Sequence, residues 1–129
     1  IGIAVKNMEE ALSVFQDGIG LKVESTDEVE TQKVRVAFLP VGETRFELLE
    51  PTADDSPIAK YLEKKGEGIH HIALKVTNIE ESLAQLKEKE VPLVNKEPVP
   101  GAHGTRIAFL HPKGTRGVML ELVEEGEHE

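Results

Sequence analysis

Two stretches of the sequence decide the fold: IGIAVKNMEEALSVF at residues 1–15 and IALKVTNIEESLAQL at residues 72–86. They match at an offset of 71 residues, with six identical positions out of fifteen. The same offset places VAFL at residues 36–39 over IAFL at residues 107–110. Self-similarity along a chain indicates a repeated structural unit. The sequence therefore consists of two copies of one module.

Each copy predicts one helix and four strands. An alternating apolar segment opens each copy and predicts a strand, after which Asn7 or Asn78 stands at a helix N-cap position with two Glu residues in the first turn. A parallel wound sheet needs more crossover helices than one per copy, so the pattern predicts an α+β fold of two βαβββ modules. The predicted strands are residues 1–6, 21–26, 33–40 and 43–50 in the first copy and 71–76, 93–97, 105–110 and 117–123 in the second.

The two modules are expected to form a single domain covering residues 1–129, since a chain of this length can bury a substantial core. The first module covers residues 1–50 and the second covers residues 69–124. Residues 51–68 between them predict a bridging helix, with Ser56 as its N-cap.

Composition narrows the functional classes. The net charge of −9 disfavours binding to a polyanionic nucleic acid, and the chain has no Trp and one Tyr for base stacking. No apolar run approaches the roughly 20 residues that span a bilayer. The absence of Cys excludes disulfides and is compatible with the cytoplasmic location that we expect.

Glu47 and Glu121 occupy equivalent positions in otherwise apolar strands, once a three-residue insertion in the second copy is taken into account. A single Glu in a strand most often faces solvent. Duplicated modules usually pack about a pseudo-twofold axis, so equivalent residues can converge on one cavity. Two converging carboxylates need a cation or a proton between them, and this pair predicts a metal site.

His71 begins the first strand of the second copy, directly after His70. Successive strand residues point to opposite faces, so only one of the two can share a cavity with Glu121, and the repeat register selects His71. The equivalent position in the first copy is the residue before Ile1, and we expect it to be a fourth ligand, His. Two imidazoles and two carboxylates suit divalent Co, Ni, Mn, Fe or Zn.

Four further side chains are candidates for substrate binding. His103 and His111 lie in predicted loops, where His is often merely solvated. Arg106 and Lys113 belong to the one basic patch near a predicted site strand, and such side chains can hold a phosphate or a carboxylate.

The repeated module with ligands on its first and last strands resembles the vicinal oxygen chelate, or glyoxalase/bleomycin-resistance, superfamily. That resemblance implies a curved mixed sheet around a metal site. Several blocks along essentially the whole chain are similar to the methylmalonyl-CoA epimerase family. They are IGIAVKNMEEAL, FELLEP, DSPIAKYLEKKG, GIHHIALKV and GAHGTRIAFLHPKGTRGVMLELVE.

The resemblance implies metal ligands at Glu47, His71 and Glu121 and a divalent cofactor, Co²⁺ foremost, with Ni²⁺, Mn²⁺, Zn²⁺ or Mg²⁺ as alternatives. It implies an isomerase of propionate metabolism, acting on a coenzyme A thioester as a homodimer. The reaction would be inversion at C2 of methylmalonyl-CoA through a metal-stabilised enolate. Glu47 and Glu121 are the candidate acid/base residues as well.

One position departs from the family pattern, and two other functions stay open. The resemblance implies a Glu base where this sequence has Val36. Another metalloenzyme of the superfamily, such as a glyoxalase or a dioxygenase, would use a similar set of ligands. A metal-free binding module would line its cavity with aromatic residues, of which this chain has five.

Overall fold

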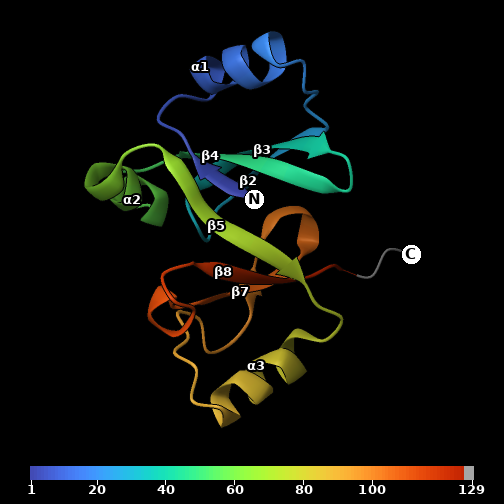
Figure 1. Ribbon diagram of the computed structural model, residues 1–129, viewed down its shortest axis with the longest axis vertical. Helices are drawn as coiled ribbons and strands as arrows, with labels where there is room; N and C mark the ends of the chain where they lie inside the picture. Colours follow the sequence, from blue (N-terminus) through green and yellow to red (C-terminus); the bar gives the residue numbers. More distant parts are fainter. Residues whose placement is uncertain (127–129) are drawn as a thin grey trace. The chain divides into compact units, whose positions relative to one another are not determined.

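The computed structural model describes residues 1–126 and divides the chain into two compact units, Ile1–His70 and His71–Glu129. The repeat predicted from the sequence is present, because each unit contains a four-stranded mixed sheet with a helix on one face (Figure 1). Among the described residues, no helix is long and apolar enough to cross a membrane.

The first unit has the strand order β2-β3-β4-β1. Strands β2, β3 and β4 are antiparallel, and β1 adds to β4 in parallel. The elements are β1 (Gly2–Ala4), α1 (Met8–Leu12), the π-helical turn η1 (Ser13–Gly18), β2 (Ser25–Val29), β3 (Val34–Val41), β4 (Thr44–Pro51) and α2 (Pro57–Lys65).

The second unit has the equivalent order β6-β7-β8-β5, with β5 parallel to β8. Its elements are β5 (Gly68–Lys75), which starts in the last residues of the first unit, α3 (Ile79–Glu88), β6 (Val99–Pro100), the 3₁₀ turn η2 (Ala102–Gly104), β7 (Arg106–Leu110), the 3₁₀ turn η3 (Pro112–Gly114) and β8 (Leu120–Glu124).

In each unit the helix packs on one face of the sheet. The candidate metal ligand on the last strand, Glu47 or Glu121, lies on the opposite face. Alternation along β4 turns Leu48 to the α1 side and Glu47 to the opposite side. Alternation along β8 likewise separates Leu122 from Glu121. The helix-side cores are Val5, Met8, Ala37, Leu39 and Leu48 in the first unit and Ile79, Leu83, Ala108, Leu110 and Leu122 in the second.

The predicted helix starts are confirmed. The side chains of Asn7 and Asn78 accept hydrogen bonds from the backbone N–H groups of Glu10 and Glu81, each at 3.0 Å. The bridging helix α2 begins after Ser56, whose hydroxyl accepts from the N–H of Ile58 at 3.2 Å. These side chains satisfy donors that the first turn of a helix leaves unpaired.

The predicted outer strands are the least accurate elements. The strand expected at residues 21–26 lies instead at Ser25–Val29. The strand expected at residues 93–97 is reduced to one bridge, between Leu93 and Leu110, followed by the two-residue β6. Three Pro residues flank residues 93–97 and lack the N–H that a strand ladder needs, which explains the loss. They are Pro92, Pro98 and Pro100.

Helix α1 ends at Leu12, and the π-helical turn η1 continues it to Gly18. One strand boundary in the second unit also differs from the prediction. Strand β8 begins at Leu120 rather than at residue 117, because Arg116 and Gly117 have φ angles of 63° and 97°. Such left-handed backbone cannot extend a strand.

Candidate metal and catalytic site

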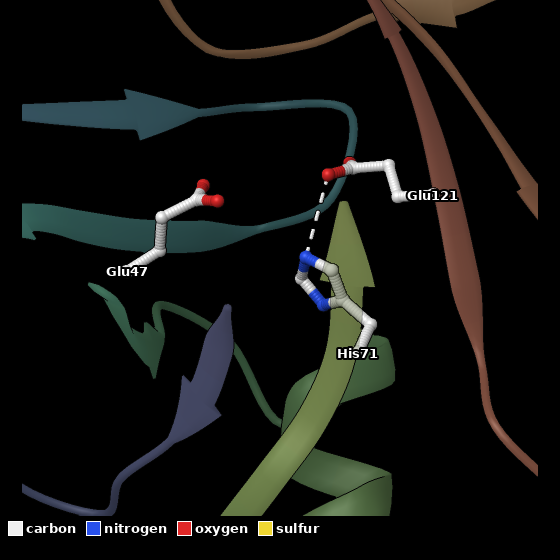
Figure 2. A group of neighbouring side chains, drawn as sticks. All are labelled: Glu47, His71 and Glu121. Atoms are coloured by element: carbon white, nitrogen blue, oxygen red, sulfur yellow. Dashed lines mark ion pairs between the residues drawn. The ribbon is translucent and has the colours of Figure 1, made fainter. Parts of the chain in front are cut away.

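The second unit places His71 beside Glu121. Glu121 on β8 pairs with Ala73 on the parallel strand β5, and His71 lies two residues before Ala73, so the two side chains share one face. The Nε2 atom of His71 is 3.3 Å from Oε1 of Glu121. Figure 2 shows the carboxylate directed toward the imidazole ring.

Both members of this pair are buried, with 4% of His71 and 7% of Glu121 exposed. An imidazole nitrogen and a carboxylate oxygen are both Lewis bases, so at this separation they need a proton or a cation between them. Imidazole and carboxylate together suit borderline divalent ions such as Co²⁺, Ni²⁺ or Zn²⁺. The donor set of the pair therefore fits a divalent metal ion.

Glu47 has the corresponding position in the first unit. It is half-buried on β4 and pairs with Gly2 on the parallel strand β1, as Glu121 pairs with Ala73. Its backbone N–H donates to the carbonyl of Ile1 at 2.8 Å, which fixes the register. Figure 2 draws Glu47 with the other two predicted ligands. The equivalence inferred from the repeat is thus present in the strand register.

His70 and His71 enter different surroundings, as strand alternation predicts. The His70 ring packs perpendicular to the ring of Tyr61, with centroids 4.8 Å apart, and Tyr61 in turn donates to the carbonyl of Ile69. The His71 ring packs perpendicular to Phe109, with centroids 5.4 Å apart. Only His71 of the two lies beside Glu121.

Phe109 also lies beside His71 and Glu121, and the sequence analysis did not assign it to the site. It is buried on β7 and pairs directly with Glu121 across the ladder, so it lies on the face that carries both His71 and Glu121. The repeat contained the signal that could have found it. Phe109 aligns with Phe38, which pairs with Glu47 in the first unit.

The four predicted substrate contacts divide between the two ends of β7. His103 precedes the strand, in η2, and has a φ angle of 53°. His111 and Lys113 follow it, both exposed, with Nδ1 of His111 accepting from the N–H of Lys113 at 3.0 Å.

Arg106, the first residue of β7, lies on the α3 face of the sheet, opposite Glu121. Its guanidinium group donates to Glu124 at 2.6 Å and also to Glu80 on α3. The hydrogen bonds to these two carboxylates raise the pKa of Arg106 further above its usual value. The structure does not bring Arg106 together with the His71–Glu121 pair.

Comparisons with known proteins agree with this architecture. A family model described as the glyoxalase/bleomycin resistance protein/dioxygenase superfamily matches residues 1–109. Protein YqjC of Bacillus subtilis is 42% identical, with the match covering all of this chain and 96% of that protein. Human mitochondrial methylmalonyl-CoA epimerase is 39% identical, over 95% of this chain and 70% of that protein.

A solved structure of similar fold carries a ligand. It is a variant of Streptomyces coelicolor methylmalonyl-CoA epimerase in complex with 2-nitronate-propionyl-CoA. This relative is 38% identical, and the match covers all of this chain and 94% of the other with a TM-score of 0.93.

Proposed function

The chain belongs to the methylmalonyl-CoA epimerase family of the glyoxalase/bleomycin resistance protein/dioxygenase superfamily, and we propose that it interconverts the (R) and (S) forms of methylmalonyl-CoA. The observation that carries the proposal is the buried pair of His71 and Glu121 on the expected strands of that fold. A metal-free binding module would instead line its cavity with aromatic residues, of which this chain has five.

We propose that Glu47, His71 and Glu121 together bind one divalent metal ion, Co²⁺ before Ni²⁺, Mn²⁺, Zn²⁺ or Mg²⁺. Two observations support this ligand set: the His71–Glu121 pair, and the identical strand register of Glu47 and Glu121 within their own sheets. When bound, such an ion supplies Lewis-acid stabilisation of the negative charge that develops on the thioester oxygen as the C2 proton leaves.

Side chains of the protein must transfer the C2 proton. Epimerisation removes the proton from one face of C2 and returns one to the other face, so it requires two acid/base groups. Glu47 and Glu121 come from different copies of the module, and we assign the two proton transfers to their carboxylates. Val36 shares the face of Glu47 and is 3% exposed, so the position of the family's Glu base is an apolar core position here.

Cationic groups would hold the acidic ends of the substrate. Coenzyme A thioesters carry phosphates, whereas this chain has a net charge of −9, so a local positive patch is needed. Lys113 supplies such a charge on the turn after β7, and His111, two residues beyond Phe109, lies on the same turn. We assign them to substrate binding, and His103 and Arg106 stay predictions for the other end of the strand.

The proposal extends to the setting of the enzyme. We propose a homodimer that acts in the cytoplasm, in propionate metabolism. Family membership supports the metabolic setting, and the absence of Cys from the sequence is compatible with a reducing cytoplasm. Size-exclusion chromatography with light scattering tests the oligomeric state.

The decisive experiment is hydrogen exchange at C2. The Co²⁺-loaded protein is incubated with a single epimer of methylmalonyl-CoA in deuterated water, and mass spectrometry and NMR follow the label. An epimerase produces the second epimer with deuterium at C2. Neither epimerisation nor deuterium uptake in a folded, metal-loaded sample would exclude the reaction. Conversion of a hemithioacetal or ring cleavage of a catechol would instead indicate a glyoxalase or a dioxygenase.

A further inference from the structure

Phe109 makes a ring contact with His71. The two rings are nearly perpendicular, with an interplanar angle of 87° and centroids 5.4 Å apart. Perpendicular packing is a favoured aromatic geometry, and it limits how far the imidazole can turn about its ring torsion. Phe109 also pairs with Glu121 in the β7–β8 ladder. It therefore contacts the predicted ligand His71 and lies directly opposite the predicted ligand Glu121 on the neighbouring strand.

The backbone of Phe109 is held by a neighbouring loop rather than by a strand. Its N–H donates to Oδ1 of Asn95 at 2.9 Å. Its carbonyl accepts from the N–H groups of Val94 at 2.9 Å and Asn95 at 3.2 Å. The Asn95 side chain therefore supplies the acceptor that the carbonyl of a regular strand partner would otherwise supply.

In the first unit the residue equivalent to Phe109 is held by a regular strand partner instead of by a side chain. The Asn95 contact is therefore specific to the second unit. In the first unit Phe38 pairs with Ser25 in a continuous β2–β3 ladder of five residue pairs. In the second unit the corresponding ladder has a gap between the Leu93–Leu110 bridge and β6, and Phe109 lies in that gap. Asn95 is half-buried there, and it holds the strand position whose ring packs on His71.

We propose that Phe109 is a positioning residue that orients the His71 imidazole toward Glu121, and that Asn95 holds Phe109 in place. This inference rests on the proposed metal site. Residues that orient metal ligands commonly change metal affinity by about 10- to 100-fold when they are removed. Phe109 acts through His71 and needs no contact with the substrate.

The first test is Co²⁺ binding to metal-free protein, measured by isothermal titration calorimetry and by the visible absorption of bound Co²⁺. Phe109→Leu removes the ring but keeps an apolar side chain. We expect its Co²⁺ affinity to fall by about tenfold or more, with a changed absorption spectrum because the ligand geometry is looser.

Ile107→Val is the matched control. Ile107 lies on the same strand and the same face, is 4% exposed, and also loses core volume in the variant. We expect both variants to unfold at a lower temperature than the wild type, and only Phe109→Leu to change Co²⁺ affinity. Equal Co²⁺ affinity and spectra in the two variants would overturn the inference.

A second pair of variants tests the Asn95 contact and covers the case in which Phe109→Leu does not fold. Asn95→Ala removes the acceptor for the Phe109 N–H, whereas Asn95→Asp retains an oxygen there. We expect Asn95→Ala to weaken Co²⁺ binding and Asn95→Asp to restore most of it. Equal binding by both variants and the wild type would contradict the inference.

The outcome for the wild type separates this inference from the proposed function. If the wild type binds no Co²⁺ or other divalent ion, the metal site itself fails and the positioning role fails with it. If the wild type binds Co²⁺ and all Phe109 and Asn95 variants bind it equally well, only the positioning role fails.

Discussion

The Glu124 carboxylate accepts a hydrogen bond of 2.8 Å from the backbone N–H of Ile79, the first residue of α3. Its other oxygen accepts from Arg106. Glu50 makes the equivalent hydrogen bonds in the first unit. It accepts from the N–H of Met8 at 2.6 Å and from the guanidinium group of Arg35 at 3.1 Å. Each unit thus uses the last strand of its sheet to hold the start of its helix, where the helix dipole favours negative charge.

Replacing Glu124 should destabilise the second unit. Glu124→Ala leaves the N–H of Ile79 without its acceptor and Arg106 with one carboxylate fewer, so we expect a Tm several degrees below that of the wild type. Glu125→Ala is the control, since Glu125 is exposed and pairs only with the exposed Lys75 among the described contacts. Its Tm should match the wild type, and equal Tm losses for the two variants would contradict the prediction.

The same carboxylate should make stability depend on pH. The hydrogen bond from Ile79, and then that from Arg106, lower the pKa of Glu124 below its ordinary value of 4.5. The unfolded chain therefore binds this proton more readily, and the stabilisation is present above pH 4.5 and is lost as the pH falls below it. The Tm difference between wild type and Glu124→Gln should shrink between pH 7 and pH 3, as calorimetry can measure. A constant difference would count against the assignment.

Glu→Gln variants at Glu47 and Glu121 should separate metal binding from proton transfer. Gln keeps an oxygen donor of similar size but has no basicity. We expect each variant to retain Co²⁺ at saturating metal, while C2 exchange falls by about 10²- to 10⁴-fold. Glu43→Gln, at an exposed position before β4, is the control and should exchange normally. An exchange rate near that of wild type at saturating metal would show that the carboxylate is a ligand alone.

His71→Ala and His70→Ala should differ in metal content. His71 lies beside Glu121, whereas His70 packs on Tyr61. Elemental analysis of the purified variants should find metal lost from His71→Ala and retained in His70→Ala. The reverse pattern would mean that the strand register deduced from the repeat is off by one residue.

Treatment of the wild type with a chelator should abolish exchange, and added Co²⁺ should restore it.

Lys113 should contribute to substrate affinity. Lys113→Ala removes an exposed cation, so we expect KM for methylmalonyl-CoA to rise by up to about fivefold with little change in kcat, as for an exposed ion pair. Raising the salt concentration should reduce the difference. Arg106→Ala gives the comparison, because this side chain already contacts two carboxylates and its loss should lower Tm. An unchanged KM in Lys113→Ala would remove it from the substrate site.

The sequence predicted the fold because the repeat combines several local signals that agree. Asn7 and Asn78 predict the helix starts through capping chemistry that involves residues only three positions away. The alternation of apolar and polar residues predicts which strand face packs on the helix, since a strand has a period of two. The equivalence of Glu47 and Glu121 follows from the same repeat, and both pair with the parallel strand at matching positions.

The outer strands were predicted poorly because they lie at the edges of the sheet, where each has a neighbouring strand on one side only. Residues 93–97 begin with the apolar pair Leu93 and Val94, but their Pro-rich surroundings leave Asn95 to complete the ladder with its side chain. A side-chain acceptor that replaces a backbone carbonyl has no local signature.

Sequence alone determined the module, its duplication, the helix starts and the matching positions of the two candidate ligands Glu47 and Glu121, because each follows from patterns within one element or from comparison of the two copies. Tertiary structure alone decided which partners the charged and aromatic side chains take. Arg106 is predicted from the sequence to bind substrate, and the tertiary structure pairs its side chain with Glu80 and Glu124 on the helix side. Tertiary packing also places Phe109 against His71, a contact that the sequence analysis did not assign. Both outcomes depend on contacts between residues at least 18 positions apart, which local patterns do not encode.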